Sequence, residues 1–160
     1  MEYNAAIEIL EFLEKYSEHF NELRAFIGEK QEKVAGDDIV WLLDSLNKEQ
    51  TFVMRGNSLE AKRKLIFEEH GIDGFNTKRL IEECPEEVKG RMKIAADSIS
   101  EAVNYIKETN QEVLELARRK LEAQADILKD SLIAGSDTYT NTGSKIKKMS
   151  SDDGNIIGSV

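Results

Sequence analysis

The two histidines are the residues whose chemistry would be easiest to recognise in a helical protein, because helices can carry paired metal ligands. A di-iron site in a helical bundle takes a glutamate three residues before each of two histidines, plus two further glutamates. Tyr16 precedes His19 at this spacing, and Phe67 precedes His70. The His-Glu-x-x-His zinc-protease motif is also absent from the sequence. We therefore interpret His19 as a helix-edge residue beside Phe20, and His70 as a favourable cation in a last helical turn.

A single cysteine, Cys84, offers no disulfide framework and no cysteine–histidine zinc cluster. It stands directly before Pro85, with glutamates on both sides. Nearby carboxylates disfavour the thiolate, which is the wrong direction for a nucleophile. The sequence therefore predicts no catalytic residue, no metal ligand and no cofactor. We expect a binding protein rather than an enzyme.

Two basic clusters, residues 62–64 and 118–120, are interleaved with acidic residues on amphipathic segments, as is typical of solvated helix faces. Trp41 stands near the start of a predicted helix. Its size favours an anchor where helix ends meet, with a role in binding as the alternative.

Charge and composition limit the classes of protein to which the chain can belong. The 160 residues fit one domain, and they carry a formal net charge of -9, which argues against nucleic acid or an anionic membrane as a partner. One proline, ten glycines and 33% charged residues indicate long, solvent-facing helices. No apolar run approaches the roughly 20 residues that span a bilayer, and the first residues lack the basic start of a signal peptide. We expect a cytoplasmic protein.

Apolar residues at heptad-like spacing predict a first helix over residues 2–34, interrupted only by Lys30. These residues are Ala6, Ile9, Leu13, Tyr16, Phe20, Leu23, Ile27 and Val34. Gly36 suits a left-handed C-cap, and Asp37 or Asp38 can cap the next helix, predicted over residues 38–69. Gly56 lies inside that helix, where we expect a local irregularity. The apolar residues of this second helix keep one drifting face: Ile39, Leu42, Leu43, Leu46, Val53, Leu59 and Ile66.

Gly71 and Gly74 predict a turn, followed by a short helix over TKRLIEE. Pro85 suits the first position of a third long helix, and Glu86 and Glu87 suit its first turn. One apolar stripe then continues to about Ala134. Its members are Val88, Met92, Ala95, Ile99, Ala102, Ile106, Val113, Ala117, Leu121, Leu128 and Leu132.

These lengths predict an all-α fold: an up-down-up antiparallel bundle of three long helices, plus the short helix before the third. The third helix is longer than the other two by several turns. Leu121, Leu128 and Leu132 would therefore stand without a partner inside the bundle, as interaction sites do. We expect a helical bundle domain over residues 1–134 and a flexible tail over residues 135–160, whose polar composition cannot offset its ordering entropy.

The order of these features resembles the FlgN-type flagellar export chaperones. A long first helix is followed by LLDSLNKEQTFVMRGNSLEAKRKLI, and the pattern ILKDSLIAGSDTYTNTG comes late in the chain. The first stretch has Glu49 and the Lys62–Arg63 pair at the expected offsets. The second has Leu128, Ser131 and Leu132, then Thr138, Tyr139 and Gly143. The asparagine expected shortly before the final Leu-x-x-Ser-Leu is replaced by Asp126 or displaced, and the residues after Gly143 have their own sequence.

The resemblance implies a cytosolic chaperone of flagellar type III export. Its clients would be the C-terminal helices of the hook-associated proteins FlgK and FlgL, and it would deliver them to the flagellar export gate. We expect the client to bind at the last apolar stripe and the tail, namely at Leu121, Leu128, Leu132, Tyr139, Ile146, Met149, Ile156 and Ile157. Tyr139 would serve either the client or the gate. The alternative is a structural coiled-coil homo-oligomer or scaffold, in which the same stripe pairs with another copy.

Overall fold

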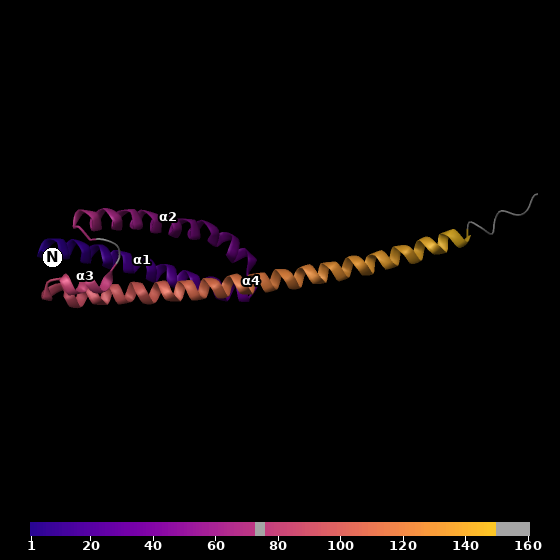
Figure 1. Ribbon diagram of the computed structural model, residues 1–160. Coiled ribbons are helices and arrows are strands. Elements are labelled where there is room, and N and C mark those ends of the chain that lie inside the picture. The colour runs from indigo at the N-terminus through magenta and orange to yellow at the C-terminus, as the bar shows by residue number, and fades with distance from the viewer. Residues whose placement is uncertain (73–75, 150–160) are drawn as a thin grey trace, which may run out of the picture. The chain divides into compact units, whose positions relative to one another are not determined.

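The computed structural model describes the backbone of residues 1–72 and 76–149, and the side chains of these residues up to Gly135. Within these ranges the chain is all-helical and has no strand. The helices are α1 (Tyr3–Ala35), α2 (Ile39–Glu69), α3 (Thr77–Glu83) and α4 (Glu86–Met149) (Figure 1). The chain forms two compact units, Met1–Leu116 and Ala117–Val160.

The helix boundaries confirm most of the predicted ones. Asp38 caps α2, because its carboxylate accepts a hydrogen bond of 3.0 Å from the Trp41 amide. Glu86 and Glu87 lie in the first turn of α4, as predicted. The left-handed residue after α1 is Asp37, with φ 57°, whereas Gly36 has φ -86°. The prediction of a left-handed Gly36 was therefore wrong.

Two further predictions about helix continuity were wrong. α2 runs unbroken through Gly56, where we expected an irregularity. α4 does not end near Ala134 but continues to Met149. Gly74 lies outside the described residues.

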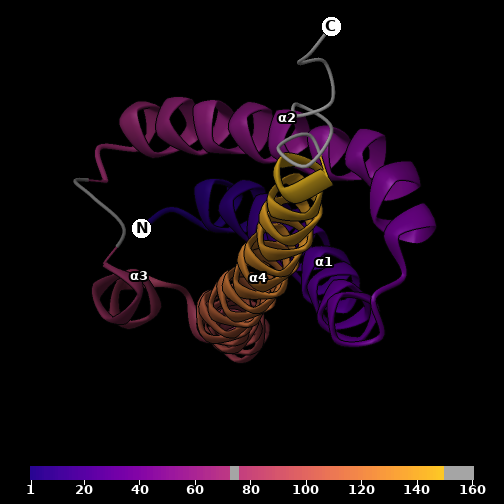
Figure 2. The ribbon, with the colours of Figure 1, turned by 90° about the vertical axis from the view of Figure 1, so that its right-hand side faces the viewer.

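In the first unit, α1 lies between α2 and α4 (Figures 1 and 2). Its predicted stripe is buried or half-buried throughout. Burial is wider than the stripe, because α1 contacts a helix on each side. Leu10, Phe12, His19 and Phe26 are also buried.

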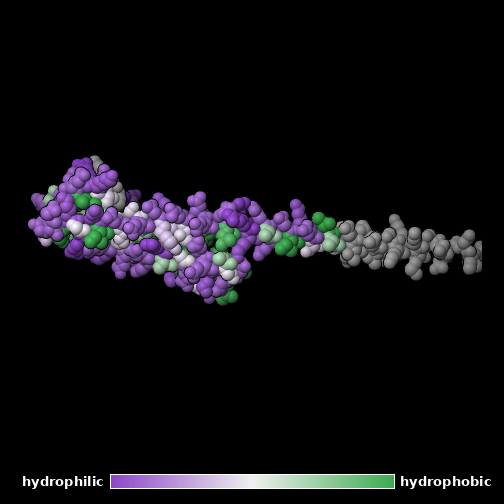
Figure 3. Space-filling model, turned by 90° about the horizontal axis from the view of Figure 1, so that it is seen from below, coloured by the Kyte–Doolittle hydropathy of each residue, from purple (hydrophilic) through white to green (hydrophobic). Residues whose placement is uncertain are grey.

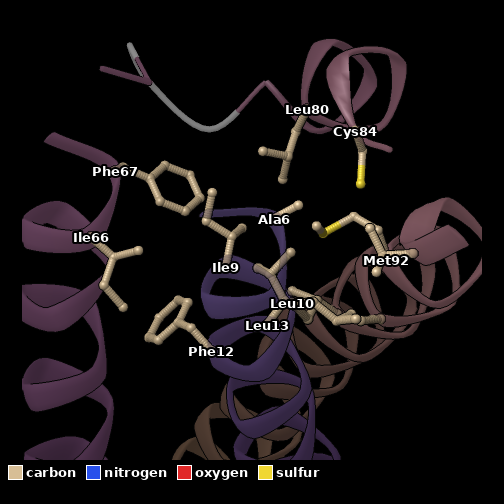
Figure 4. Close-up of a cluster of buried hydrophobic side chains, with 13 residues drawn as sticks. Ala6, Ile9, Leu10, Phe12, Leu13, Ile66, Phe67, Leu80, Cys84 and Met92 are labelled. Atoms are coloured by element: carbon tan, nitrogen blue, oxygen red, sulfur yellow. The ribbon is translucent and has the colours of Figure 1, made fainter. Parts of the chain in front are cut away.

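The main core gathers around the first half of α1, with residues from the end of α2, from α3 and from the start of α4 (Figure 4). Leu10 of α1 and Met92 of α4 are almost fully buried there. Phe67 and Leu80 close this core from α2 and α3. A second, smaller cluster holds Phe26, Ile27 and Ile106, with Leu23, Trp41 and Phe52 against it.

Polar contacts fix α1 against both neighbours. Lys30, which interrupts the apolar series of α1, pairs with Glu49 of α2 at 2.8 Å. On the other side Ser17 donates a hydrogen bond of 2.8 Å to Ser98 of α4. The polar interruption at Lys30 therefore places an ion pair between α1 and α2.

α2 packs differently from its prediction. Its buried residues are Ser45, Ile66 and Phe67. Ile39, Leu43, Leu46 and Val53, which we expected on the packed face, are 54 to 65% exposed. Leu42, Leu59 and Ile66 of the predicted series are half-buried or buried, as expected. Trp41 and Phe52 join them on the face toward α1.

Candidate functional site

The candidate site is an apolar stripe on α4 within the second unit. Leu121, Leu128 and Leu132 are spaced by seven and four residues, which places them on one face of a helix. Their exposed fractions are 67, 64 and 72%. The prediction that these three leucines lack a partner is therefore met in the described part of the chain. Figure 3 shows apolar surface recurring along the helix before the grey residues.

Two exposed apolar residues in this stretch were not among the predicted binding residues. Ile127 is 67% and Ile133 is 59% exposed. Successive helical residues are about 100° apart, so Ile127 and Ile133 lie on either flank of the leucine stripe. The sequence feature that could have identified them is their position next to Leu128 and Leu132.

Polar groups around the stripe form an ion pair and a hydrogen bond within α4 itself. Arg118 and Glu122 form an i,i+4 ion pair at 2.6 Å. The Ser131 hydroxyl donates a hydrogen bond of 2.9 Å to the Ile127 carbonyl. These bonds stabilise the helix itself and leave the leucines available for another apolar surface.

The same heptad-like spacing is buried in the first unit, where α4 packs against α1. Val88, Met92, Ile99 and Ile106 are at most 8% exposed. Fully burying one leucine side chain is worth about 1.5 to 3 kcal/mol. Three uncovered leucines on one face form the kind of surface to which an amphipathic helix binds.

The remaining predicted client-binding residues cannot be placed as side chains. The backbone of α4 includes Tyr139, Ile146 and Met149, but the structure does not describe their side chains. Ile156 and Ile157 lie outside the described residues altogether.

His19 is buried, contrary to the helix-edge prediction, with 2% of its surface exposed. Its ring contacts Phe20 at 5.4 Å and Phe52 of α2 at 6.1 Å between centroids, and its Nδ1 has no hydrogen-bond partner among the described residues. Burial, followed by the charge of Arg55, lowers the pKa of His19, which Glu22 partly offsets. His19 is therefore a neutral imidazole that packs between α1 and α2. His70 caps α2 and contacts Glu8 at 3.1 Å.

Trp41 is an anchor between the end of α1 and the start of α2. Its ring stacks on Phe26 at 5.9 Å, and its indole N–H donates a hydrogen bond of 3.0 Å to Glu29. Lys33 lies over the same ring at 5.9 Å. The prediction of an anchor where helix ends meet is confirmed.

Cys84 is buried in the main core. Burial is the principal cause that raises the pKa of its thiol, and the nearby Glu86 adds little. The predicted direction was right, but we had assigned it to the carboxylates. A raised pKa favours the unreactive thiol form.

One groove in the first unit, of about 490 Å³, has an apolar wall of Ile99 and Val103 and a polar wall from α2. In the polar wall Arg63 donates two hydrogen bonds to Glu60, at 2.7 and 2.8 Å. Tyr16 donates a third, of 3.2 Å, to the same carboxylate. Hydrogen bonding to Arg63 lowers the pKa of Glu60. Tyr16, Glu60 and Arg63 of this groove thus bond to one another.

Within the described ranges no three histidine, cysteine, aspartate or glutamate side chains are grouped to hold a metal ion. In the same ranges, none of the helices has an apolar stretch sufficient to cross a membrane. Comparison with models of protein families, with curated proteins and with solved structures gives no match for this chain.

Proposed function

We propose that this protein is a cytosolic chaperone of flagellar type III export. Its clients are the hook-associated proteins FlgK and FlgL. The chaperone binds their C-terminal helices, prevents premature assembly and delivers them to the export gate. One observation carries the proposal: Leu121, Leu128 and Leu132 lie exposed on one face of α4 at the spacing that an amphipathic helix would match.

The client helix binds by packing its apolar face against α4. The client's apolar face covers the three exposed leucines. Tyr139, Ile146, Met149, Ile156 and Ile157 add contacts from the C-terminal part of the chain.

The proposal includes an antiparallel up-down-up arrangement of α1, α2 and the first part of α4, which serves as the rigid support for the client-binding part. Contacts of α1 with both α2 and α4 support this arrangement. The alternative is a coiled-coil homo-oligomer in which the α4 leucines pair with those of another copy.

Sedimentation velocity of the full chain, with and without a peptide of the FlgK or FlgL C-terminal helix, separates these two functions. The chaperone binds the peptide as a defined complex. A tight homo-oligomer that the peptide leaves unchanged, and that dissociates when Leu128 and Leu132 are replaced by aspartate, supports the alternative instead.

A further inference from the structure

α2 carries a second apolar face, directed away from α1. Six apolar residues in its first half are exposed by 54 to 72%: Ile39, Val40, Leu43, Leu46, Val53 and Met54. Leu65 continues this face near the end of the helix, with 66% exposed. We call these seven residues, with the uncharged residues between them, the outer face of α2.

From Ile39 to Ala61, about six turns, the outer face contains no charged residue, and the exposed Lys64 is the next residue of the same series. Ile39, Leu43, Leu46, Gln50, Val53 and Asn57 follow one another at alternating steps of four and three, which is the spacing of a coiled-coil seam. Asn47, Ser58 and Ala61 fill the same arc and are exposed. From Ile39 to Ala61 this surface is about 33 Å long. Such a long, uncharged seam on a helix that already packs by its other side indicates a contact with a further helix.

The charged residues beside this face indicate which helix makes that contact. Asp44 and Lys62 are both exposed, and neither forms an ion pair among the described residues. They are separated by about five helical turns, so they border the outer face on the same side, about 27 Å apart. Within one chain they cannot meet.

Asp44 and Lys62 can meet between two copies of the chain whose α2 helices pack antiparallel. In an antiparallel pair, matching flanks face each other, so Asp44 of each copy lies opposite Lys62 of the other. The twofold axis then passes near Val53, midway between the two charges. Glu68 comes near the start of the other α2, where the helix dipole favours negative charge.

This register also interleaves the apolar residues. Leu65 of one copy falls between Ile39 and Leu43 of the other, and Ala61 falls between Leu43 and Leu46. The small Ala61 leaves room for those two leucines. Charge and shape therefore specify the same register.

We propose that the protein forms a twofold-symmetric dimer in which two α2 helices pack antiparallel through their outer faces, with reciprocal Asp44–Lys62 ion pairs. All of these residues belong to α2. The inference therefore does not depend on the chaperone proposal.

Sedimentation equilibrium of the purified full chain, without any client, tests for the dimer. Leu43→Asp with Leu46→Asp should weaken dimerisation about a hundredfold or more, because two charges per copy would be buried at the seam. Since both leucines are exposed within one chain, far-UV circular dichroism should stay unchanged. Leu128→Asp with Leu132→Asp is the matched control and should leave the dimer intact.

Charge exchange tests the register. Asp44→Lys alone, or Lys62→Asp alone, turns two attractions into two repulsions and should weaken the dimer about tenfold at low salt. The double variant should restore it. Because the two positions lie about 27 Å apart within one helix, restoration requires contact between copies.

Cysteine cross-linking tests the orientation in a Cys84→Ala background. Val53→Cys lies at the proposed axis and should form a disulfide-linked dimer on oxidation. Ile39→Cys should not, because the two copies of residue 39 lie about 40 Å apart in an antiparallel pair. A monomer at several hundred micromolar, a dimer that only the α4 substitutions disrupt, no restoration in the double variant, or efficient linkage at residue 39 would each overturn the proposal.

Discussion

The imidazole of His19 lies directly against Gly56, its Nε2 only 3.3 Å from the position that a Cβ would occupy there. His19 belongs to α1 and Gly56 to the middle of α2. A glycine inside a helix costs about 1 kcal/mol relative to alanine. Here the missing side chain allows a buried ring from the neighbouring helix to approach the α2 backbone.

Gly56→Ala should therefore give no gain in the free energy of unfolding, although alanine is the better helix former. The added methyl group crowds His19, which Phe20 and Phe52 hold in place. Gly90→Ala is the matched control, because a Cβ at Gly90 would meet no described atom within 4 Å apart from its chain neighbours and the backbone of its own helix. That substitution should stabilise by about 0.5 to 1 kcal/mol in urea titrations.

A double variant isolates the contact. In a His19→Ala background, Gly56→Ala should become stabilising, since the ring that opposes the methyl group is gone. Equal gains from Gly56→Ala and Gly90→Ala in the wild-type background would mean that His19 moves aside freely.

The stability of the protein should fall as the pH drops below about 6.5, the ordinary pKa of histidine. Burial lowers the pKa of His19 in the folded state, so the unfolded chain binds more protons in this range. The stabilising contribution of the neutral ring is complete above the unfolded pKa. It is lost as the pH falls toward the folded pKa.

Urea titrations of wild-type protein and His19→Leu between pH 5 and 7.5 measure this effect. Leucine keeps an apolar side chain at this position and removes the titration. The slope of unfolding free energy against pH should be smaller in His19→Leu. Identical slopes would assign the pH dependence to other groups.

Tyr139→Ala should weaken binding of either the client helix or the export gate by about 1 to 3 kcal/mol, because tyrosine anchors interfaces at low entropic cost. Calorimetric titration against a client C-terminal helix, and separately against the cytoplasmic domain of the gate, identifies the partner. The melting temperature should not change. Wild-type affinity for both partners would make Tyr139 a residue without a binding role.

Helix existence and most boundaries followed from the sequence, because apolar spacing and caps are local signals. The TKRLIEE segment is an example, since α3 covers those same seven residues. The left-handed residue at Asp37 was missed. Glycine is usually preferred there, but aspartate also tolerates the conformation.

The packing of α2 could not be predicted from its own sequence. Two apolar arcs lie on opposite sides of this helix, and spacing alone does not say which of them meets α1. The structure places Ile66 and Phe67 inward and leaves Leu43 and Leu46 exposed. The burial of His19 was missed for the same reason, since it depends on Gly56 of another helix.

At the candidate site, Leu121, Leu128 and Leu132 could be predicted because their register continues that of the buried α4 residues. The extension of α4 to Met149 could not, since its polar composition favoured a tail.

In the function proposed above, the exposed leucines of α4 bind the client helix. The most direct measurement is calorimetric titration of a FlgK or FlgL C-terminal helix into Leu128→Asp with Leu132→Asp. The control, Ala123→Asp with Ala134→Asp, adds the same charge to the opposite face of the helix. We expect the leucine variant to lose client binding, while the control binds normally and both keep wild-type circular dichroism. Undiminished binding by a folded leucine variant would contradict this proposal.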